Sequence, residues 1–390
     1  MREGWKEYKL GEVGLLQRGR SRHRPRYAFH LYGGKYPFIQ TGEIRESRKY
    51  ITQFSQTYND AGLEQSKLWP TGTLCITIAA NIAELAILSF DACFPDSVLG
   101  FIPDKEKADL DFVYYMLTYF QKELKYLGEG SVQDNINLGT FEDIAFFLPP
   151  LPEQRAIASV LSSLDDKIDL LHRENKTLES MAETLFRQWF VEEEKQVSSK
   201  NAKITELIEF NPKRQMKKGS IAPYLDMSNV STSTFHPDNW YDREFNSGTK
   251  FVNGDTLLAR ITPCLENGKS AYVTFLEDGQ IGWGSTEFIV MCTKFNLHPF
   301  LAYTLARNKD FRDYAESCLE GTSGRQRVNI DHLANYEIVI PPDNVIQSFN
   351  EFISLIVPKL HANFIQIRTL SALRDTLLPK LMSGEVRVSL

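Results

Sequence analysis

Residues 148–190, LPPLPEQRAIASVLSSLDDKIDLLHRENKTLESMAETLFRQWF, contain the feature that decides the fold, one long amphipathic helix. From Ile157 to Trp189, apolar side chains recur in alternating steps of four and three residues, and the polar member of the series is Asn175. This spacing is the heptad pattern of a coiled coil. The prolines at the start of the stretch suit a first helical turn. A helix within one large core usually has about 8–20 residues, so the length favours a coiled coil.

The chain contains an internal repeat at a shift of 192 residues. NLGTFEDIAFFLPP, which begins at Asn137, aligns with NIDHLANYEIVIPP, which begins at Asn329, and the double prolines coincide. The same shift carries the heptad onto a second stripe, from Phe349 to Leu381, with its asparagine at Asn363. If the helices pack antiparallel with paired numbers that sum to 538, Asn175 faces Asn363. We predict that these two asparagines satisfy each other and fix the register of the helix pair.

These motifs resemble the specificity (S) subunits of type I restriction-modification systems. The resemblance rests on PLPEQRAIASVLSSLDDKIDLL, on ETLFRQWF and on the closing LRDTLLPKLMSGEVRV, which are similar to that family's two conserved helices. PPDNVIQSFNEFISLIVPKL, which opens the second helix, departs from the PLPEQ pattern. The resemblance implies an α+β fold in which two long antiparallel coiled-coil helices separate two similar globular target-recognition domains, with a pseudo-two-fold internal repeat.

The repeat and the resemblance together predict four segments. They are a first target-recognition domain (1–150), a spacer helix with a linker (151–196), a second target-recognition domain (197–341), and a second spacer helix with a C-terminal return strand (342–390). The charged run VEEEKQVSSKNAK, which follows Phe190, marks the linker. By the pseudo-symmetry, we expect residues 385–388 to form a strand that returns to the first domain near residues 5–10.

Composition narrows the class of protein. With 390 residues and 42% hydrophobic residues, the chain is expected to fold into two or three domains. The net charge of −6 argues at first against a nucleic-acid partner. However, residues 152–196 carry 6 basic and 10 acidic residues, whereas residues 197–390 carry 21 of each. The negative excess therefore lies largely on the spacer, which suits a protein partner and leaves the globular halves for DNA.

The cysteines and the hydropathy pattern indicate a compartment. The five cysteines form no CxxC pair, which favours a reducing environment over a disulfide framework. No run of residues approaches the ~18 apolar residues of a membrane span. We expect a cytoplasmic protein that does not contact a membrane. The seven histidines lack the spacing of metal ligands, so no metal site is predicted.

Five arginines alternate within LLQRGRSRHRPRY near the start of the chain. In an extended segment, a period of two places all five guanidinium groups on one side, where they could follow successive phosphates or a groove of DNA. A mobile, solvated loop is the alternative interpretation. The residues of this predicted row are Arg18, Arg20, Arg22, Arg24 and Arg26.

Two pairs of equivalent loops supply further candidate DNA contacts. Loops that share a scaffold but carry different side chains are expected of domains that read different bases, although each could also be a plain structural turn. Between strand-like runs, the candidates are Thr77 and Asn81 in the first half, and Arg260, Thr262, Asn267 and Lys269 in the second. In the later Gly-rich loops, they are Ser131, Gln133 and Asn135, and then Thr322, Ser323, Arg325, Gln326 and Arg327. Gln133 and Asn135 suit adenine, whereas Arg325 and Arg327 suit guanine or phosphate.

The sequence lacks the catalytic motifs of methyltransferases and of ATP-driven translocases. The chain has neither the glycine-rich cofactor loop of a methyltransferase nor the P-loop of a translocase. Asp96, Glu123 and Lys125 match only the outline of a Mg²⁺-dependent nuclease, and Glu123 and Lys125 fall at the end of an amphipathic helix. A stand-alone nuclease and an architectural DNA-binding protein are the two alternatives to a non-catalytic sequence reader.

The resemblance supplies the expected function and partners. It implies that each recognition domain binds one half of a split site in double-stranded DNA, while two methylation subunits and the restriction subunits dock on this chain. S-adenosylmethionine, ATP and Mg²⁺ are then expected on the partner subunits, and no cofactor is expected on this chain. An overlap of about 33 helical residues makes the spacer roughly 50 Å long, comparable to about 15 base pairs of DNA.

Overall fold

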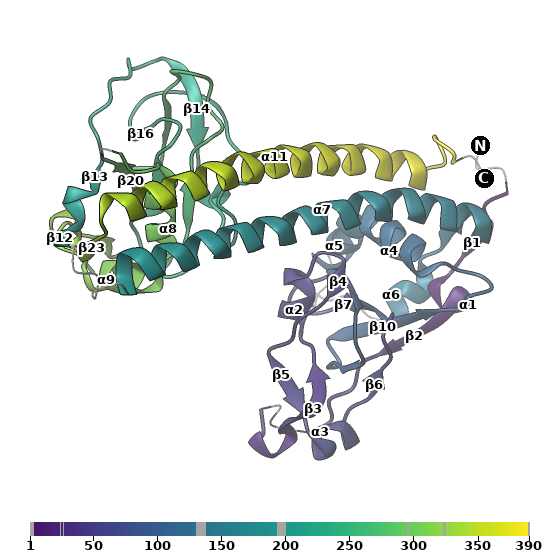
Figure 1. The fold of residues 1–390 in the computed structure, drawn as a ribbon. Helices are drawn as coiled ribbons and strands as arrows, with labels where there is room; N and C mark the ends of the chain where they lie inside the picture. The colour runs from purple at the N-terminus through teal and green to yellow at the C-terminus, as the bar shows by residue number, and fades with distance from the viewer. Residues whose placement is uncertain are drawn as a thin grey trace. The chain divides into compact units, whose positions relative to one another are not determined.

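The computed structural model describes residues 4–23, 25, 27–129, 138–192, 200–294, 296–322 and 325–388. The chain folds into two compact units (Figure 1). Unit 1 comprises Met1–Ile168 with Thr369–Leu390, and unit 2 comprises Asp169–Arg368. The long helices α7 (Leu151–Arg187) and α11 (Asp343–Met382) each contribute residues to both units. Within the described residues, no helix is long and apolar enough to cross a membrane.

Unit 1 is built on two sheets. The larger has the strand order β2-β10-β7-β8-β4 and the smaller the order β5-β3-β9-β6. Besides the long helices, the elements of unit 1 are β1 (Lys6–Tyr8), α1 (Leu10–Val13), β2 (Gly14–Arg18), η1 (Phe29–Leu31), β3 (Tyr32–Phe38), α2 (Thr41–Glu46), β4 (Tyr50–Ile51), β5 (Gln56–Tyr58), α3 (Asp60–Glu64), β6 (Leu68–Trp69), β7 (Leu74–Thr77), β8 (Leu85–Leu88), β9 (Ala92–Cys93), β10 (Val98–Pro103), α4 (Leu110–Tyr119), α5 (Gln121–Glu129), α6 (Leu138–Asp143) and β11 (Phe146–Leu148).

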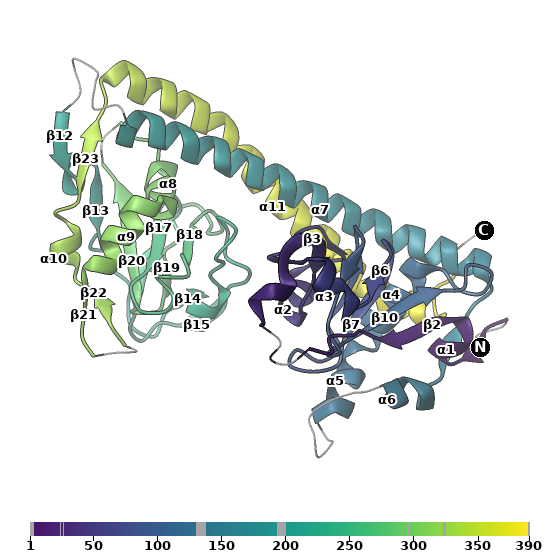
Figure 2. The ribbon, with the colours of Figure 1, turned by 90° about the horizontal axis from the view of Figure 1, so that it is seen from below.

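Unit 2 repeats this architecture, and Figure 2 shows its paired strands β12 and β23. Its sheets have the orders β13-β20-β17-β18 and β15-β14-β19-β16. The elements of unit 2 are η2 (Gln188–Glu192), β12 (Lys200–Lys203), η3 (Ile204–Glu206), β13 (Ile208–Phe210), β14 (Ile221–Leu225), η4 (Met227–Asn229), β15 (Tyr241–Glu244), β16 (Thr249–Phe251), β17 (Thr256–Ala259), β18 (Ser270–Tyr272), β19 (Gly282–Gly284), β20 (Phe288–Thr293), α8 (Phe300–Arg307), α9 (Lys309–Ser317), β21 (Leu319–Glu320), β22 (Arg327–Val328), α10 (Ile330–Leu333) and β23 (Glu337–Ile340).

The two units share one topology. β2, β10, β7 and β8 of unit 1 correspond in order to β13, β20, β17 and β18 of unit 2. In the four-stranded sheet of unit 1 and its counterpart in unit 2, the two inner strands pair in parallel, β3 with β9 and β14 with β19, whereas their outer neighbours pair antiparallel. The internal repeat predicted from the sequence is therefore a repeat of the whole fold unit.

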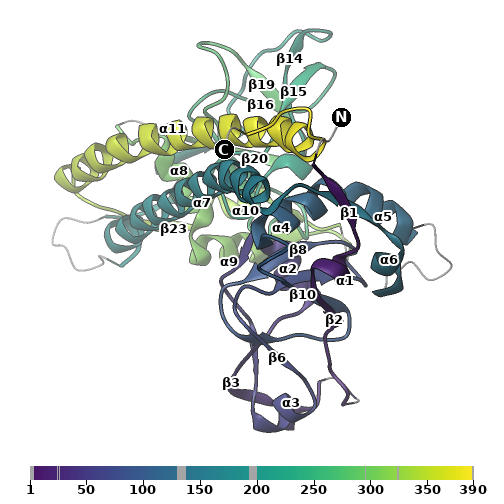
Figure 3. The same cartoon turned by 90° about the vertical axis from the view of Figure 1, so that its right-hand side faces the viewer.

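The central strand β7 is apolar except for its last residue, Thr77, because both faces of the larger sheet are covered. In β7, Leu74 and Ile76 lie in a core that also contains Phe112 of α4, whereas Cys75 lies in a second core with Trp69. Alternate residues of a strand point to opposite faces, so a continuous apolar run fits a sheet buried on both sides. Figure 3 shows the resulting layers in unit 1, with α4 between α7 and the strands.

The two long helices run antiparallel within each unit. In unit 2, Asn363 Nδ2 donates to Asn175 Oδ1 at 2.8 Å, so the asparagines occupy one layer, as paired numbers that sum to 538 require. The same nitrogen donates to Glu174 Oε2 at 2.9 Å. In unit 1, Ile157 of α7 shares its hydrophobic core with Leu381 of α11. The seam residues also belong to the cores of the globular parts, so each helix segment is a structural member of its unit.

The predicted C-terminal return strand is wrong. Residues 383–388 follow α11 without forming a strand, and β1 instead pairs with β11. The repeat explains this result: β12 and β23 form the equivalent pair in unit 2, and by the 192-residue shift residues 385–388 align in sequence with residues 193–196, before β12. The tail is nevertheless anchored in unit 1, because Arg387 donates two hydrogen bonds to the carboxylate of Glu153, at 3.0 and 2.8 Å.

Candidate nucleic-acid interface

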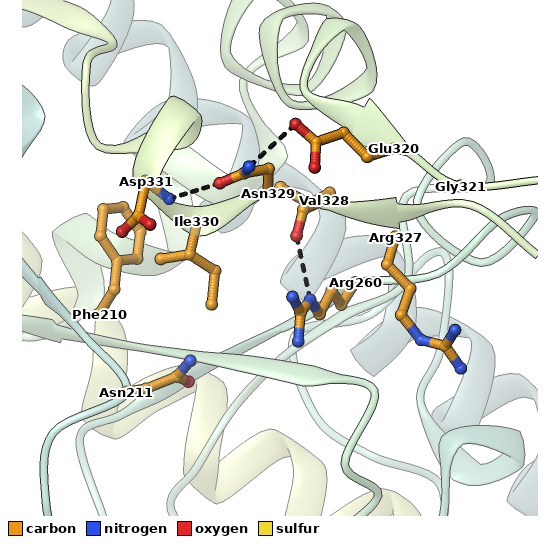
Figure 4. Close-up of a pocket in the computed structure, with 10 residues that line it drawn as sticks. All are labelled: Phe210, Asn211, Arg260, Glu320, Gly321, Arg327, Val328, Asn329, Ile330 and Asp331. Carbon is orange, nitrogen blue, oxygen red and sulfur yellow. Dashed lines mark hydrogen bonds between the residues drawn. The ribbon is translucent and has the colours of Figure 1, made fainter.

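In unit 2, two predicted loops form one surface. The loop between β17 and β18 pairs with the β21–β22 hairpin: Thr262 N donates to Gln326 O at 3.1 Å, and Val328 N donates to Arg260 O at 2.9 Å. Ile261 and Arg327 form an isolated antiparallel bridge. Beside this junction lies an open hollow of about 770 Å³, which Arg260 and Arg327 help to line (Figure 4). The structure thus brings together candidates from two loops that are distant in sequence. They are Arg260 and Thr262 from one loop, and Gln326 and Arg327 from the other.

Arg260 is held firmly at this junction. Its backbone N donates to Glu287 O at 2.8 Å, and its side-chain Nε donates to Val328 O at 3.0 Å. Within the described part of the chain, its two terminal nitrogens have no hydrogen-bond partner. The guanidinium group lies in the hollow, between the β22 side and Asn211 (Figure 4). Arg260 therefore presents two donors in a fixed direction.

The charge of Arg327 is neutralised by an ion pair with Glu287. Its Nε and Nη2 atoms bond both carboxylate oxygens of Glu287 at 2.6–3.0 Å. This bidentate pair is a strong, directional form of ion pair. Glu287 lies just before β20, 40 residues away in sequence, so the pattern around Arg327 gave no indication of it. The predicted guanine or phosphate contact through Arg327 would require this pair to open.

Acidic and amide side chains also line the hollow, and the sequence did not indicate them. Glu320 Oε1 accepts from Asn329 Nδ2 at 2.9 Å and lies 3.3 Å from His332 Nδ1. Asn329 caps α10, because its Oδ1 accepts from Asp331 N at 2.9 Å. Asn211 is fixed in a left-handed conformation, with φ of 49°, and its Oδ1 accepts from Val290 N at 2.8 Å. The N-I-D sequence that begins at Asn329 is a recognisable helix-capping pattern.

The other predicted DNA-contact residues of unit 2 differ in side-chain exposure and hydrogen bonding. Lys269 Nζ donates to Met227 O at 2.9 Å, which ties it to the η4 turn. Thr262 Oγ1 is buried without a hydrogen-bond partner among the described residues. The residues with exposed side chains are Asn267, Thr322 and Arg325. Ser323 lies outside the described residues.

The equivalent loop of unit 1 corrects one prediction. Thr77 is fully buried, and its Oγ1 donates to Asn81 O and accepts from Glu84 N. It closes the turn between β7 and β8, and its side chain is not exposed at the surface. Asn81 is partly exposed, and its Oδ1 accepts from Arg45 at 3.3 Å, an exposed arginine that the sequence analysis did not select. Ser131, Gln133 and Asn135 lie outside the described residues.

The structure describes three arginines of the predicted row, and they are not equally exposed. Arg18 donates to Asp96 O, whereas the guanidinium of Arg20 turns inward and donates to Ser66 O. The cause is Gly19, which packs so tightly against Pro95 O that a Cβ atom there would lie 2.3 Å from it. The close approach draws the chain inward and buries part of Arg20. Arg22 is exposed, and Arg24 and Arg26 lie outside the described residues.

A nuclease centre is not supported. Lys125 Nζ pairs with Glu84 at 2.9 Å, and its partner belongs to the β7–β8 turn, not to the suggested triad. Glu123 lies on the exposed side of α5. In the described ranges, no group of three or more His, Cys, Asp or Glu side chains is placed to hold a metal ion.

Comparison with known proteins agrees with this architecture. Residues 2–180 match the family described as type I restriction modification DNA specificity domain. The specificity subunit of the type I restriction enzyme MjaIX from Methanocaldococcus jannaschii is 25% identical, over 98% of this chain and 94% of that protein. The specificity subunit of the type I restriction enzyme HindI from Haemophilus influenzae is 20% identical, over 98% of this chain and 99% of that protein.

A solved structure has the same fold. The S subunit of a type I restriction-modification system from M. genitalium superimposes with a TM-score of 0.58 at 17% identity, and the match covers 97% of this chain and 96% of that one. At 17% identity this match shows a shared fold, in which two similar domains are joined by long helices. The match over residues 2–180 and the full-length relatives show that the chain is similar to the specificity subunits of type I restriction-modification systems, which agrees with the resemblance found in its helix motifs.

Proposed function

We propose that this chain reads a split sequence in double-stranded DNA, one half-site with each unit, and directs partner subunits to it. The observation that carries the proposal is the duplication itself: two units of the same strand order present different side chains from equivalent β7–β8 and β17–β18 loops. Different donors and acceptors on one scaffold are what reading two different base sequences requires. The elongated loop of unit 2, with Arg260 and Lys269, and the compact one of unit 1, with Asn81, then belong to different half-sites.

The proposed partners are two methylation subunits and the restriction subunits of a type I complex. The proposal rests on the similarity to specificity subunits and on the surplus of negative charge in residues 152–196. S-adenosylmethionine would bind the methylation subunits, and ATP and Mg²⁺ the restriction subunits. This chain would recognise the target sequence, and the partner subunits would catalyse the reactions.

A half-site exchange tests this function. Residues 200–340 are replaced by the equivalent segment of another specificity subunit, and the hybrid is expressed with the methylation subunits. Mapping of methylated adenines in the cell DNA should show that one half of the target changes while the other half stays. A matched exchange of residues 4–148 should change the opposite half. If either exchange altered both halves or neither, the assignment of one half-site to each unit would be wrong.

A further inference from the structure

The two arginines that line the hollow of unit 2 differ in their hydrogen bonding: Arg327 forms an ion pair, and among the described residues Arg260 does not. The Nε and Nη2 edge of Arg327 is bonded to Glu287 through three hydrogen bonds of 2.6–3.0 Å. Arg260 uses only Nε, toward Val328 O, and its Nη1 and Nη2 atoms remain open within the described part of the chain. Of these two predicted readers, Arg260 alone is ready to bind without breaking an ion pair.

The anchoring of Arg260 fits reading of a base better than a loose electrostatic contact. Its backbone is fixed on both sides, by Glu287 O and by Val328 N, and its side chain is partly buried. A guanidinium held at Nε can turn little, so its two outer N–H groups keep one direction. Fixing a side chain before binding removes much of the entropic cost of forming two hydrogen bonds at once. Guanine offers O6 and N7 as two adjacent acceptors in the major groove, which match this pair of donors.

The other groups of the hollow argue against a phosphate as the occupant. Glu320 and Asp331 line the same hollow, and carboxylates repel a phosphate group. They can, however, accept a hydrogen bond from the N4 amino group of cytosine, which lies beside guanine O6 in a G·C pair. A donor pair next to acceptors is thus the complement of a G·C edge.

We propose that Arg260 reads a guanine, in the major groove of the half-site bound by unit 2, through its two terminal nitrogens. This inference rests on the proposed function and deepens it by naming a specificity-determining residue and its base. Arg327, paired with Glu287, does not read a base in this arrangement.

The test uses the complex of this chain with its methylation subunits, and a set of target duplexes in which each base pair of both half-sites is changed in turn. Affinity is measured by competition at fixed salt, for the wild type, Arg260→Ala and Arg260→Lys. Arg260→Ala should lower affinity for the intact target by roughly 10- to 100-fold and erase the preference for one G·C pair in the unit 2 half-site. Preferences in the other half-site should persist, which shows that the complex is assembled.

Arg260→Lys separates a base contact from a phosphate contact. Lysine keeps the charge but cannot offer the planar pair of donors, so general affinity should be retained while the G·C preference is lost. Arg325→Ala, on the exposed tip of the same hairpin, is the matched comparison and should weaken all duplexes alike.

Two results would overturn the inference. One is an equal loss for every sequence in Arg260→Ala that lysine fully restores, which would make Arg260 a phosphate contact. The other is an unchanged preference at every position. If the wild-type complex itself showed no sequence preference, the proposed function would fail, whereas a wild type that discriminates and variants that discriminate equally would reject only the role of Arg260.

Discussion

Glu179 shows how burial in unit 2 sets the ionisation of a single side chain. It lies on α7 with 7% of its surface exposed, and Tyr303 of α8 donates to its Oε2 at 2.7 Å. Burial raises the pKa of this carboxyl to about 7, and hydrogen bonds from Tyr303 and the Phe235 backbone only partly oppose the shift. The unfolded chain would ionise it near pH 4.5. Between these values the folded state holds more protons, so Glu179 destabilises unit 2 as the pH rises.

We predict that Glu179→Gln flattens this pH dependence. Glutamine keeps an acceptor for Tyr303 without the charge, so the variant should be more stable than the wild type by about 2–3 kcal/mol at pH 8 and little different near pH 4.5. Thermal unfolding across this pH range measures the difference. The exposed Glu351→Gln on α11 is the control. A constant difference between wild type and Glu179→Gln at all pH values would contradict the prediction.

The Glu287–Arg327 pair predicts a gain of binding. Glu287→Gln removes the charge that neutralises Arg327, so the arginine becomes available to phosphates. Affinity for any duplex should rise by roughly 3- to 10-fold, and the salt dependence should steepen by about one ion. Titrations at several salt concentrations measure both quantities. Glu277→Gln, an exposed residue of the same unit, should change them little, and an effect equal to that of Glu287→Gln would count against release of Arg327.

At the scale of the element, the C-terminal tail depends on one ion pair. Glu153 is 3% exposed at the start of α7, and Arg387 satisfies both of its oxygens. Arg387→Ala would leave a buried carboxylate without its cation, and we expect a loss of about 1–3 kcal/mol of stability. Urea unfolding of the full chain measures this loss. Glu385→Ala, on the exposed part of the same tail, should be nearly neutral, and equal effects of the two substitutions would show that the tail is not anchored through Arg387.

The asparagine layer gives a second prediction at this scale. Asn175→Leu leaves a proton of Asn363 without its buried acceptor, which should cost about 1–3 kcal/mol. Asn175→Leu combined with Asn363→Leu removes both polar groups and should recover most of that loss, because an apolar pair replaces a satisfied polar one. A double-mutant cycle by urea unfolding measures the coupling between the two positions. Additive effects would mean that the two side chains do not depend on each other.

Elements with a long period were predictable from the sequence, whereas contacts between distant elements were not. The heptad of α7 and the 192-residue shift are visible along the chain, and they led to the Asn175–Asn363 register and to the repeat. Thr77 and Arg20 look like surface polar residues in sequence, but their partners, Glu84 and Ser66, are set by a turn and by the close packing of Gly19. The C-terminal tail was wrongly predicted to form a strand beside residues 5–10. In the structure, β1 in that segment pairs with β11.

At the scale of the whole molecule, the repeat is nearly symmetric but not fully so. Both units are built on two corresponding sheets, with β4 as an additional strand in unit 1, and each unit has its own hydrophobic cores. The side chains that differ between the units include those of the loops around Asn81 and Arg260 and some in the helix seams. The scaffold is therefore common to both units, while the loops provide the differences on which a two-part target depends.

The asparagine layer lies just off the centre of this pseudo-symmetry. By the same register and repeat shift, two copies of α7 paired with each other would place Asn175 against Leu171, and two copies of α11 would place Asn363 against Ile367. Each self-pairing buries two amides without partners, a cost absent from the native pair. A peptide of residues 151–192 should therefore self-associate weakly, and Asn175→Leu should strengthen that association in sedimentation equilibrium. The position of the asparagines thus disfavours pairing of α7 with α7 or of α11 with α11. It favours pairing of α7 with α11.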